Sequence, residues 1–354
     1  MVPPDGLRLR APDQGSMSGR RRFLSALFGG RVDRPAVANG SSVVTLELME
    51  MAEARFPDVH LDGVKAARLA ATAHEVLGYD AVMPVFSGHA ESAAMGCDVV
   101  WGERDSWPDT RDHPFDEVEK VRMPSDFLEC PSMRAVLDAI SLLRRDYGDR
   151  VAVIGKVYGP WNLAYHLLGT EELLVEMMVD PDKVRRYLDA TMEISLVSAK
   201  AQIEAGADAI LWCDNATGDL VRAESYRDFL LPLHREITKA VGCPLILHIC
   251  GETADRLEHV VQAGFDCLHF DSKVNARLAK EIVGDRMSLM GNVNCPTTLR
   301  TGSPEDVRRE ALVAMEAGVE IPAPECVVPL TTPIASLKAI VEAACDFGRQ
   351  SCKP

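Results

Sequence analysis

The stretch Pro244-Leu-Ile-Leu-His-Ile-Cys-Gly251 is a short apolar run bounded by a proline and a glycine. A run of this length between such residues is typical of a buried β-strand. Because residues two apart on a strand point to the same face, we expect His248 and Cys250 to project side by side. The stretch therefore predicts a buried strand that carries two potential metal ligands at its end.

Similar runs recur on both sides of this stretch and alternate with helical patterns. The predicted strands span residues 36–44, 81–86, 151–157, 209–213, 245–250, 267–270, 288–293 and 319–322. The predicted helices span residues 20–28, 64–77, 132–147, 171–179, 181–204, 223–241, 253–263, 275–283, 304–317 and 333–347. This alternation favours an α/β fold, a single (β/α)8 TIM-type barrel with an N-terminal extension. We expect residues 1–17 to be a flexible tail and residues 18–354 to form the barrel.

Composition narrows the class of protein. The 354 residues are 47% hydrophobic and carry a net charge of −15, which argues against a nucleic-acid partner. The ten cysteines are scattered, as is typical of reduced thiols in a cytoplasmic protein. Arg20-Arg-Arg-Phe-Leu24 looks like a twin-arginine export signal, but Arg31, Asp33 and Arg34 interrupt the apolar stretch after it. We therefore expect a cytoplasmic protein that does not span a membrane.

Polar side chains follow several of the predicted strands. The carboxyl ends of barrel strands meet at one mouth, where barrel enzymes hold their active sites. Convergence there makes these residues candidates for function. We expect catalytic roles for Glu91, Asp214 and Asn292. We expect cofactor-binding roles for Asn215, Asp271 and Asn294.

A third sulfur ligand, Cys326, follows the last predicted strand. One imidazole and two thiolates suit zinc, and three protein ligands leave a position open for chemistry. A thiol that enters this position loses its proton, which favours transfer of an alkyl group to sulfur over hydrolysis. Sequence separation alone leaves open whether Cys326 lies near His248 and Cys250, and a chance H-x-C pair in a barrel without metal is the alternative.

Several motifs resemble the methylcobamide:coenzyme M methyltransferases of the uroporphyrinogen decarboxylase-like superfamily. They are His248-Ile-Cys-Gly251, Gly291-Asn-Val293 and the Cys326 segment with Thr332-Pro333. The similarity runs from about residue 18 to the C-terminus. It implies a barrel with one Zn²⁺ on His248, Cys250 and Cys326, and methyl transfer from a methylated corrinoid. Candidates for a fourth ligand are Glu91, Asp214 and Glu325.

The resemblance leaves the methyl acceptor open between a coenzyme M-type thiol and tetrahydrofolate. Asp58-Val-His-Leu-Asp-Gly63 matches the D-x-H-x-x-G pattern of corrinoid-binding domains but lacks the rest of such a domain. We therefore expect the methyl-corrinoid on a separate corrinoid-binding protein, and this chain as a monomer or homodimer.

Two other functions remain to be weighed. A uroporphyrinogen decarboxylase-type lyase acting on a porphyrinogen is the alternative enzyme. Against it, the Met-Arg-Gln-Ala-Gly-Arg motif that grips propionates is missing, and Val37-Ala-Asn-Gly-Ser-Ser42 stands in roughly the equivalent place. A barrel whose zinc only stabilises the fold, and which docks on a corrinoid protein, is the non-catalytic alternative.

Overall fold

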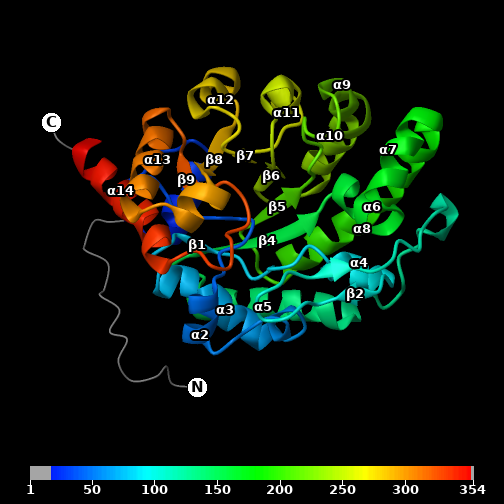
Figure 1. Cartoon of the computed structure of the whole chain (residues 1–354), viewed down its shortest axis with the longest axis horizontal. Helices are drawn as coiled ribbons and strands as arrows, with labels where there is room; N and C mark the ends of the chain where they lie inside the picture. The colour runs from blue at the N-terminus through cyan, green and yellow to red at the C-terminus, as the bar shows by residue number, and fades with distance from the viewer. Residues whose placement is uncertain (1–16, 352–354) are drawn as a thin grey trace.

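A curled parallel sheet forms the centre of the molecule (Figure 1). The computed structural model describes residues 17–351, and within them seven strands pair in the order β1-β4-β5-β6-β7-β8-β9. These strands are β1 (Ala81–Val82), β4 (Ala152–Tyr158), β5 (Ala209–Cys213), β6 (Leu245–Ile249), β7 (Cys267–Phe270), β8 (Ser288–Val293) and β9 (Ile321–Pro324). Every neighbouring pair is parallel, which confirms the predicted TIM-type fold class.

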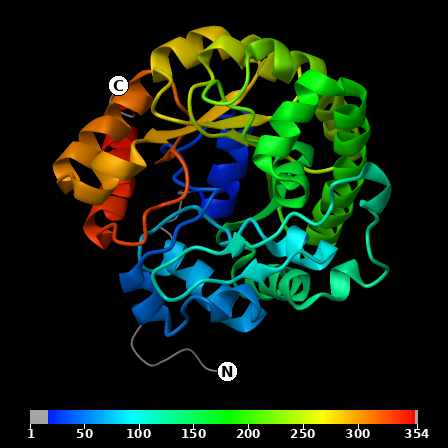
Figure 2. The same ribbon diagram turned by 45° about the vertical axis from the view of Figure 1, so that its right-hand side comes forward.

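Helices surround the sheet in a ring (Figure 2). They are α1 (Gly19–Leu27), α2 (Leu46–Ala52), α3 (Gly63–Glu75), α4 (Ala90–Met95), α5 (Pro131–Tyr147), α6 (Pro160–Leu168), α7 (Thr170–Val179), α8 (Pro181–Glu204), α9 (Ala223–Ser225), α10 (Leu231–Ala240), α11 (Leu257–Val261), α12 (Ala276–Val283), α13 (Pro304–Glu316) and α14 (Ile334–Ser351). Short 3₁₀ turns lie at Asp58–His60, Val118–Lys120, Phe127–Glu129 and Ala254–Arg256, and π-helical turns at Tyr226–Leu230 and Cys295–Leu299. In the described part of the chain, no helix combines the length and the apolar composition that a membrane span requires.

The predicted strand over residues 36–44 is wrong, because this buried segment forms no ladder. The side chain of Asn39 accepts a hydrogen bond from the backbone of Ser41 and donates to the carbonyl of Ser42, which turns the chain. The segment still lies between β1 and the chain after β9. Val37 accepts a backbone bond from Asp80, and Ser42 accepts one from Val328. An irregular segment thus occupies the place of the eighth strand.

The other expectations differ from the structure mainly at element ends. Strands β5, β7 and β8 and helix α8 have their predicted bounds, whereas β1 is shorter than predicted and β9 begins two residues later. The helices that were not predicted include α2, α4 and α6, which have only six to nine residues and so too few turns for a clear periodic pattern. A small antiparallel hairpin pairs β2 (Val99–Val100) with β3 (Asp109–Thr110).

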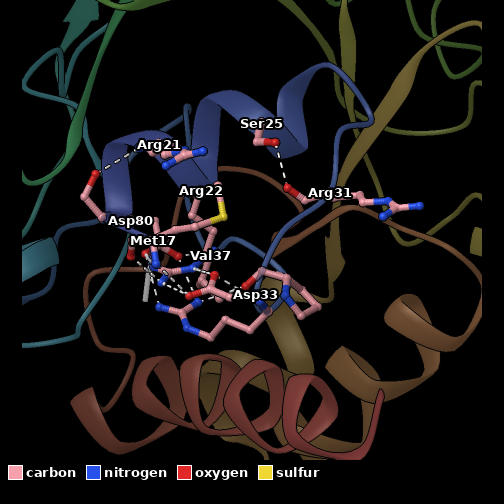
Figure 3. Close-up of polar contacts among 11 residues, drawn as sticks. Met17, Arg21, Arg22, Ser25, Arg31, Asp33, Val37 and Asp80 are labelled. Carbon is pink, nitrogen blue, oxygen red and sulfur yellow. Dashed lines mark hydrogen bonds and ion pairs between the residues drawn. The ribbon is translucent and has the colours of Figure 1, made fainter. Parts of the chain in front are cut away.

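The N-terminal extension packs helix α1 against the ends of the strands where they begin (Figure 3). Arg22 is buried there. Its guanidinium pairs with Asp33 at 2.6 Å and with Asp80, just before β1, at 2.6 Å. Arg20 pairs with Asp208, just before β5. The hydrogen bond from Arg22 is the main cause that lowers the pKa of Asp33 to about 2.

The flexible tail predicted for residues 1–17 lies almost wholly outside the described residues. Met17 is described, and its backbone N–H donates to the carboxylate of Asp33 at 3.0 Å. Its carbonyl accepts a hydrogen bond from Arg22. The anchored part of the chain therefore begins by Met17.

Candidate metal centre

Strand register sets which side chains share the interior of the barrel. Tyr158 pairs with Cys213, Cys213 with His248, and His248 with His269. Because residues paired in register point to the same face, these four side chains all point into the barrel. They lie near the carboxyl ends of their strands, and Cys250 follows two residues after His248.

Three potential metal ligands meet at this end of the barrel. His248 Nε2 lies 3.0 Å from the sulfur of Cys250 and 3.5 Å from that of Cys326, and the two sulfurs are 2.9 Å apart. Cys326 comes two residues after β9, three strands away from β6 in the sheet. Among the described residues, these three form the sole group of histidine, cysteine or acidic residues clustered as metal ligands.

Hydrogen bonds that involve backbone groups orient two of the three ligands, His248 and Cys250. His248 Nδ1 lies 3.2 Å from the carbonyl oxygen of His269, which can only accept, so Nδ1 carries the proton and Nε2 is free to bind a metal. Asn215 accepts a hydrogen bond from the backbone N–H of Cys250. Asp271 accepts one from Gly251. Two of the three residues predicted to bind a cofactor, Asn215 and Asp271, thus hold the loop that carries Cys250.

The two sulfurs cannot both be thiolates at this distance without a cation between them. The hydrogen bond that Cys250 donates to Cys326 raises the pKa of Cys250 and is the main cause that lowers the pKa of Cys326. A neutral imidazole with two thiolates is a donor set that a divalent, borderline-soft cation such as Zn²⁺ satisfies. The residues present therefore fit the metal.

Asp214 lies in a different environment from the three ligands. One carboxylate oxygen accepts from the backbone N–H groups of Trp161 and Asn162 at the start of α6. The other accepts from Trp212 and lies 2.8 Å from Nε2 of His234, a fully buried residue of α10. These contacts indicate that Asp214 joins β5 to two helices. Its predicted catalytic role stays a prediction.

The remaining predicted residues are also bonded to their surroundings. Glu91 is buried on α4, where it accepts from the hydroxyl of Ser198, and burial raises the pKa of its carboxyl. Asn292 donates to the carbonyl of Val274. Asn294 caps the turn at Cys295–Leu299. None of these three side chains contacts His248, Cys250 or Cys326 in the described structure.

The third candidate for a fourth ligand, Glu325, is buried beside Cys326. Its carboxylate accepts from the backbone N–H groups of Ser272 and Cys295. These bonds connect the loops after β7 and β8 to the segment after β9. Glu325 therefore supports the loop that carries Cys326.

Sequence reasoning missed a cavity beside the metal ligands. It has a volume of about 450 Å³, and its lining includes Lys156, Tyr158, His89 and Val327, the residue after Cys326. The signal that was available is Lys156 itself, a lone charged residue within the apolar run at 151–157. A charge in a buried strand is rare unless it has a partner or a function.

The fold and the site together define a parallel α/β barrel with a candidate metal centre at the carboxyl ends of its strands. The family model described as uroporphyrinogen decarboxylase matches residues 18–347. A methylated-thiol–coenzyme M methyltransferase from Methanosarcina mazei is 34% identical over 92% of this chain and 89% of the relative. The methylcobamide:CoM methyltransferase MtaA from Methanosarcina barkeri is 31% identical over 93% and 98%.

A solved structure of a methyltransferase from Methanosarcina mazei has a TM-score of 0.91 to this chain. The two are 32% identical over 94% of this chain and 99% of that one. The chain belongs to the uroporphyrinogen decarboxylase family and, within it, groups with the methylcobamide:CoM methyltransferases. This confirms the resemblance drawn from the motifs at His248 and Cys326.

Proposed function

We propose that this chain is a zinc-dependent methyltransferase, which moves a methyl group from a methylated corrinoid protein to the thiol of a coenzyme M-type acceptor. The observation that carries the proposal is the cluster of His248 Nε2 with the sulfurs of Cys250 and Cys326, all within 4.8 Å of one another. Similarity to proteins named methylcobamide:CoM methyltransferases supports the choice of donor and acceptor.

Hydrogen bonds within this chain hold His248 and Cys250 in position to bind a metal. The bond from His248 to the His269 carbonyl turns Nε2 toward the sulfurs, and Asn215 holds the backbone of Cys250. A zinc ion bound to these ligands would lower the pKa of an acceptor thiol, so that the acceptor is a thiolate at neutral pH.

The overall transfer balances without any further reactant. The acceptor thiol releases its proton to solvent, and its sulfur forms a bond to the methyl carbon. The cobalt–carbon bond breaks, and both of its electrons remain on cobalt. The protein's contribution is to position the sulfur in line with that bond.

We propose that the corrinoid arrives on a separate carrier protein. His60, the histidine of the D-x-H-x-x-G pattern, is buried, with its ring 4.4 Å from that of Phe56 and 5.6 Å from that of Trp101. Asp62 caps helix α3. His60 and Asp62 therefore already have structural roles within this chain. This supports a corrinoid carrier that is a separate protein.

We further propose a cytoplasmic location, since a zinc–thiolate centre needs reduced sulfur. The nine cysteines among the described residues are all free. The subunit composition, monomer or homodimer, stays a prediction.

The test combines metal content with methyl transfer. Purified protein is expected to contain about one zinc per chain and to form methylated product from methylcobalamin and 2-mercaptoethanesulfonate. The variants Cys250→Ser and Cys326→Ser should lose most of the zinc and the transfer. Cys130→Ser, at a half-buried cysteine outside the cluster, is the matched control and should retain both.

Parallel reactions with tetrahydrofolate as acceptor and with a porphyrinogen as substrate separate the alternatives. Methylation of tetrahydrofolate but not of the thiol would change the acceptor. Porphyrinogen decarboxylation by metal-free protein, without methyl transfer, would refute the proposed function in favour of the lyase.

A further inference from the structure

Lys156 is a buried cation inside the barrel. It lies on β4, where side chains alternate between the interior and the helices outside. A Cβ added to the preceding Gly155 would meet Ile210 and Gln202, so that position faces outward. Lys156 therefore faces inward, as does Tyr158 two residues later. Only 3% of the surface of Lys156 is exposed.

The ammonium group of Lys156 lacks an ion-pair partner among the described residues. Nζ donates to the carbonyl of Ser41 at 3.0 Å and to that of Val85 at 3.3 Å. An ammonium has three N–H groups, so these two carbonyls leave one for a further acceptor. The ring of Tyr158, whose centroid lies 5.8 Å from Nζ, adds a cation–π contact but no ion pair. The buried Glu91 is a nearby carboxylate, but it bonds to the hydroxyl of Ser198 and does not pair with the lysine. A buried charge is costly unless something pairs with it.

The cavity beside Lys156 gives such a partner a place to bind. Its wall also includes Tyr158 and Val327, and Val327 follows Cys326 directly, so the cavity adjoins the segment that carries this candidate ligand. The rest of its wall includes Trp107 and His89, and Nδ1 of His89 has no hydrogen-bond partner among the described residues. The cavity thus combines one cation and an unsatisfied polar atom with mostly apolar and aromatic surface.

We propose that this cavity binds the methyl acceptor, and that Lys156 binds an anionic group at the end of the acceptor opposite its thiol. The chemical class is a small thiol that carries a sulfonate or carboxylate. The proposal rests on the proposed function in one respect only, the placement of the thiol end at His248, Cys250 and Cys326. Lys156 would then determine specificity and position the substrate, without touching the reacting atoms.

The first experiment measures binding without any reaction. Ethanesulfonate, which has no thiol, is titrated into wild-type protein and into Lys156→Met by calorimetry. Wild type is expected to bind it, and Lys156→Met to bind about 10- to 100-fold more weakly, the usual effect of losing a charge-assisted hydrogen bond. Lys156→Arg should restore part of the binding. Lys200→Met, an exposed residue on α8, is the matched control and should behave as wild type.

The second experiment compares two acceptors with methylcobalamin as the donor. For 2-mercaptoethanesulfonate, Lys156→Met should raise KM about 10- to 100-fold. For the uncharged 2-mercaptoethanol, KM and kcat should be close to those of wild type. An equal loss with both thiols would overturn the proposal, because it would indicate a structural role for Lys156.

The two experiments fail in different ways. If wild type binds ethanesulfonate but methylates neither thiol, the proposed function is wrong and the anion site stands. If wild type fails to bind ethanesulfonate, or uses both thiols with the same KM, the anion site is wrong. Should Lys156→Met not fold, these wild-type comparisons and Lys156→Arg still decide the question.

Discussion

The ring of His248 donates from Nδ1 to the carbonyl of His269, and this one contact leaves the other nitrogen free to bind a metal. Two aspartates that each follow the end of a strand also differ in the groups they contact. Asp271 bonds to Gly251 next to the ligand Cys250, whereas Asp214 bonds to α6 and α10. Residues of the same type at equivalent positions thus serve different purposes, according to the direction in which each side chain points.

At the residue scale, we predict that Asp214→Asn lowers the free energy of unfolding by about 3 kcal/mol. The amide that replaces one oxygen can no longer accept from both Trp212 and His234, and these groups are fully buried. Urea unfolding measures the change, and zinc per folded chain should equal that of wild type. Asp182→Asn, at an exposed carboxylate on α8, is the control. Loss of zinc without loss of stability would instead place Asp214 at the metal.

At the scale of elements, an irregular segment and a short helix complete the barrel. Residues 36–44 carry the apolar residues of a strand but are turned by Asn39, and they contribute Ser41 to the environment of Lys156. Gly40 is required here, since an added Cβ would lie 2.6 Å from a side-chain carbon of Leu211. Helix α1 is anchored to the segments that precede the strands through Arg20 and Arg22.

We predict that Arg22→Met lowers the free energy of unfolding by about 3–5 kcal/mol, because it leaves the carboxylate of Asp80 buried with fewer partners. Thermal or urea unfolding measures the effect. The neighbouring Arg21→Met removes an exposed charge from the same helix and should change stability little. Equal effects of the two variants would contradict an anchoring role for Arg22.

The ion pair of α1 also predicts a dependence on pH. Arg22 lowers the pKa of Asp33 from its ordinary value of 3.8 to about 2 in the folded protein. The stabilisation is therefore fully present above about pH 4 and is lost as the pH falls toward 2. Arg22→Met should show a shallower loss over this interval, as followed by urea unfolding at each pH. The contribution is small, since the carboxylate of Asp33 is partly exposed to solvent.

At the scale of the whole molecule, the two ends of the barrel are specialised. Helix α1 and its ion pairs lie where the strands begin, whereas the metal ligands and the cavity lie where the strands end. This separation is general in parallel barrels, where one end contributes stability and the other holds the site. The ligands come from β6 and from the chain after β9, while the core extends over the whole barrel.

We therefore predict that removal of zinc abolishes methyl transfer but leaves the barrel folded. Treatment with 1,10-phenanthroline should eliminate transfer with the far-ultraviolet circular dichroism spectrum unchanged, and added Zn²⁺ should restore it. Loss of zinc removes only the stabilisation that zinc binding gives to the folded state, so the melting temperature should fall modestly. Cooperative unfolding on chelation would instead support the alternative in which zinc only stabilises the fold.

The sequence by itself determined the features that depend on local patterns. Short apolar runs predicted β5, β7 and β8 within their observed bounds, and the two-residue period of a strand placed His248 and Cys250 on one face. Motifs around these residues and Cys326 identified the family. Such features follow from the geometry of a few consecutive residues, which the sequence specifies directly.

Only the tertiary structure decided which distant residues meet. Cys250 and Cys326 lie 76 residues apart, and the curl of the sheet brings their sulfurs to 2.9 Å. The tertiary packing also directs Asp214 outward to α6 and α10, places residues 36–44 beside β1 without a ladder, and leaves the ammonium of Lys156 at a cavity. These outcomes depend on packing between segments far apart in the chain, and local periodicity contains no information about it.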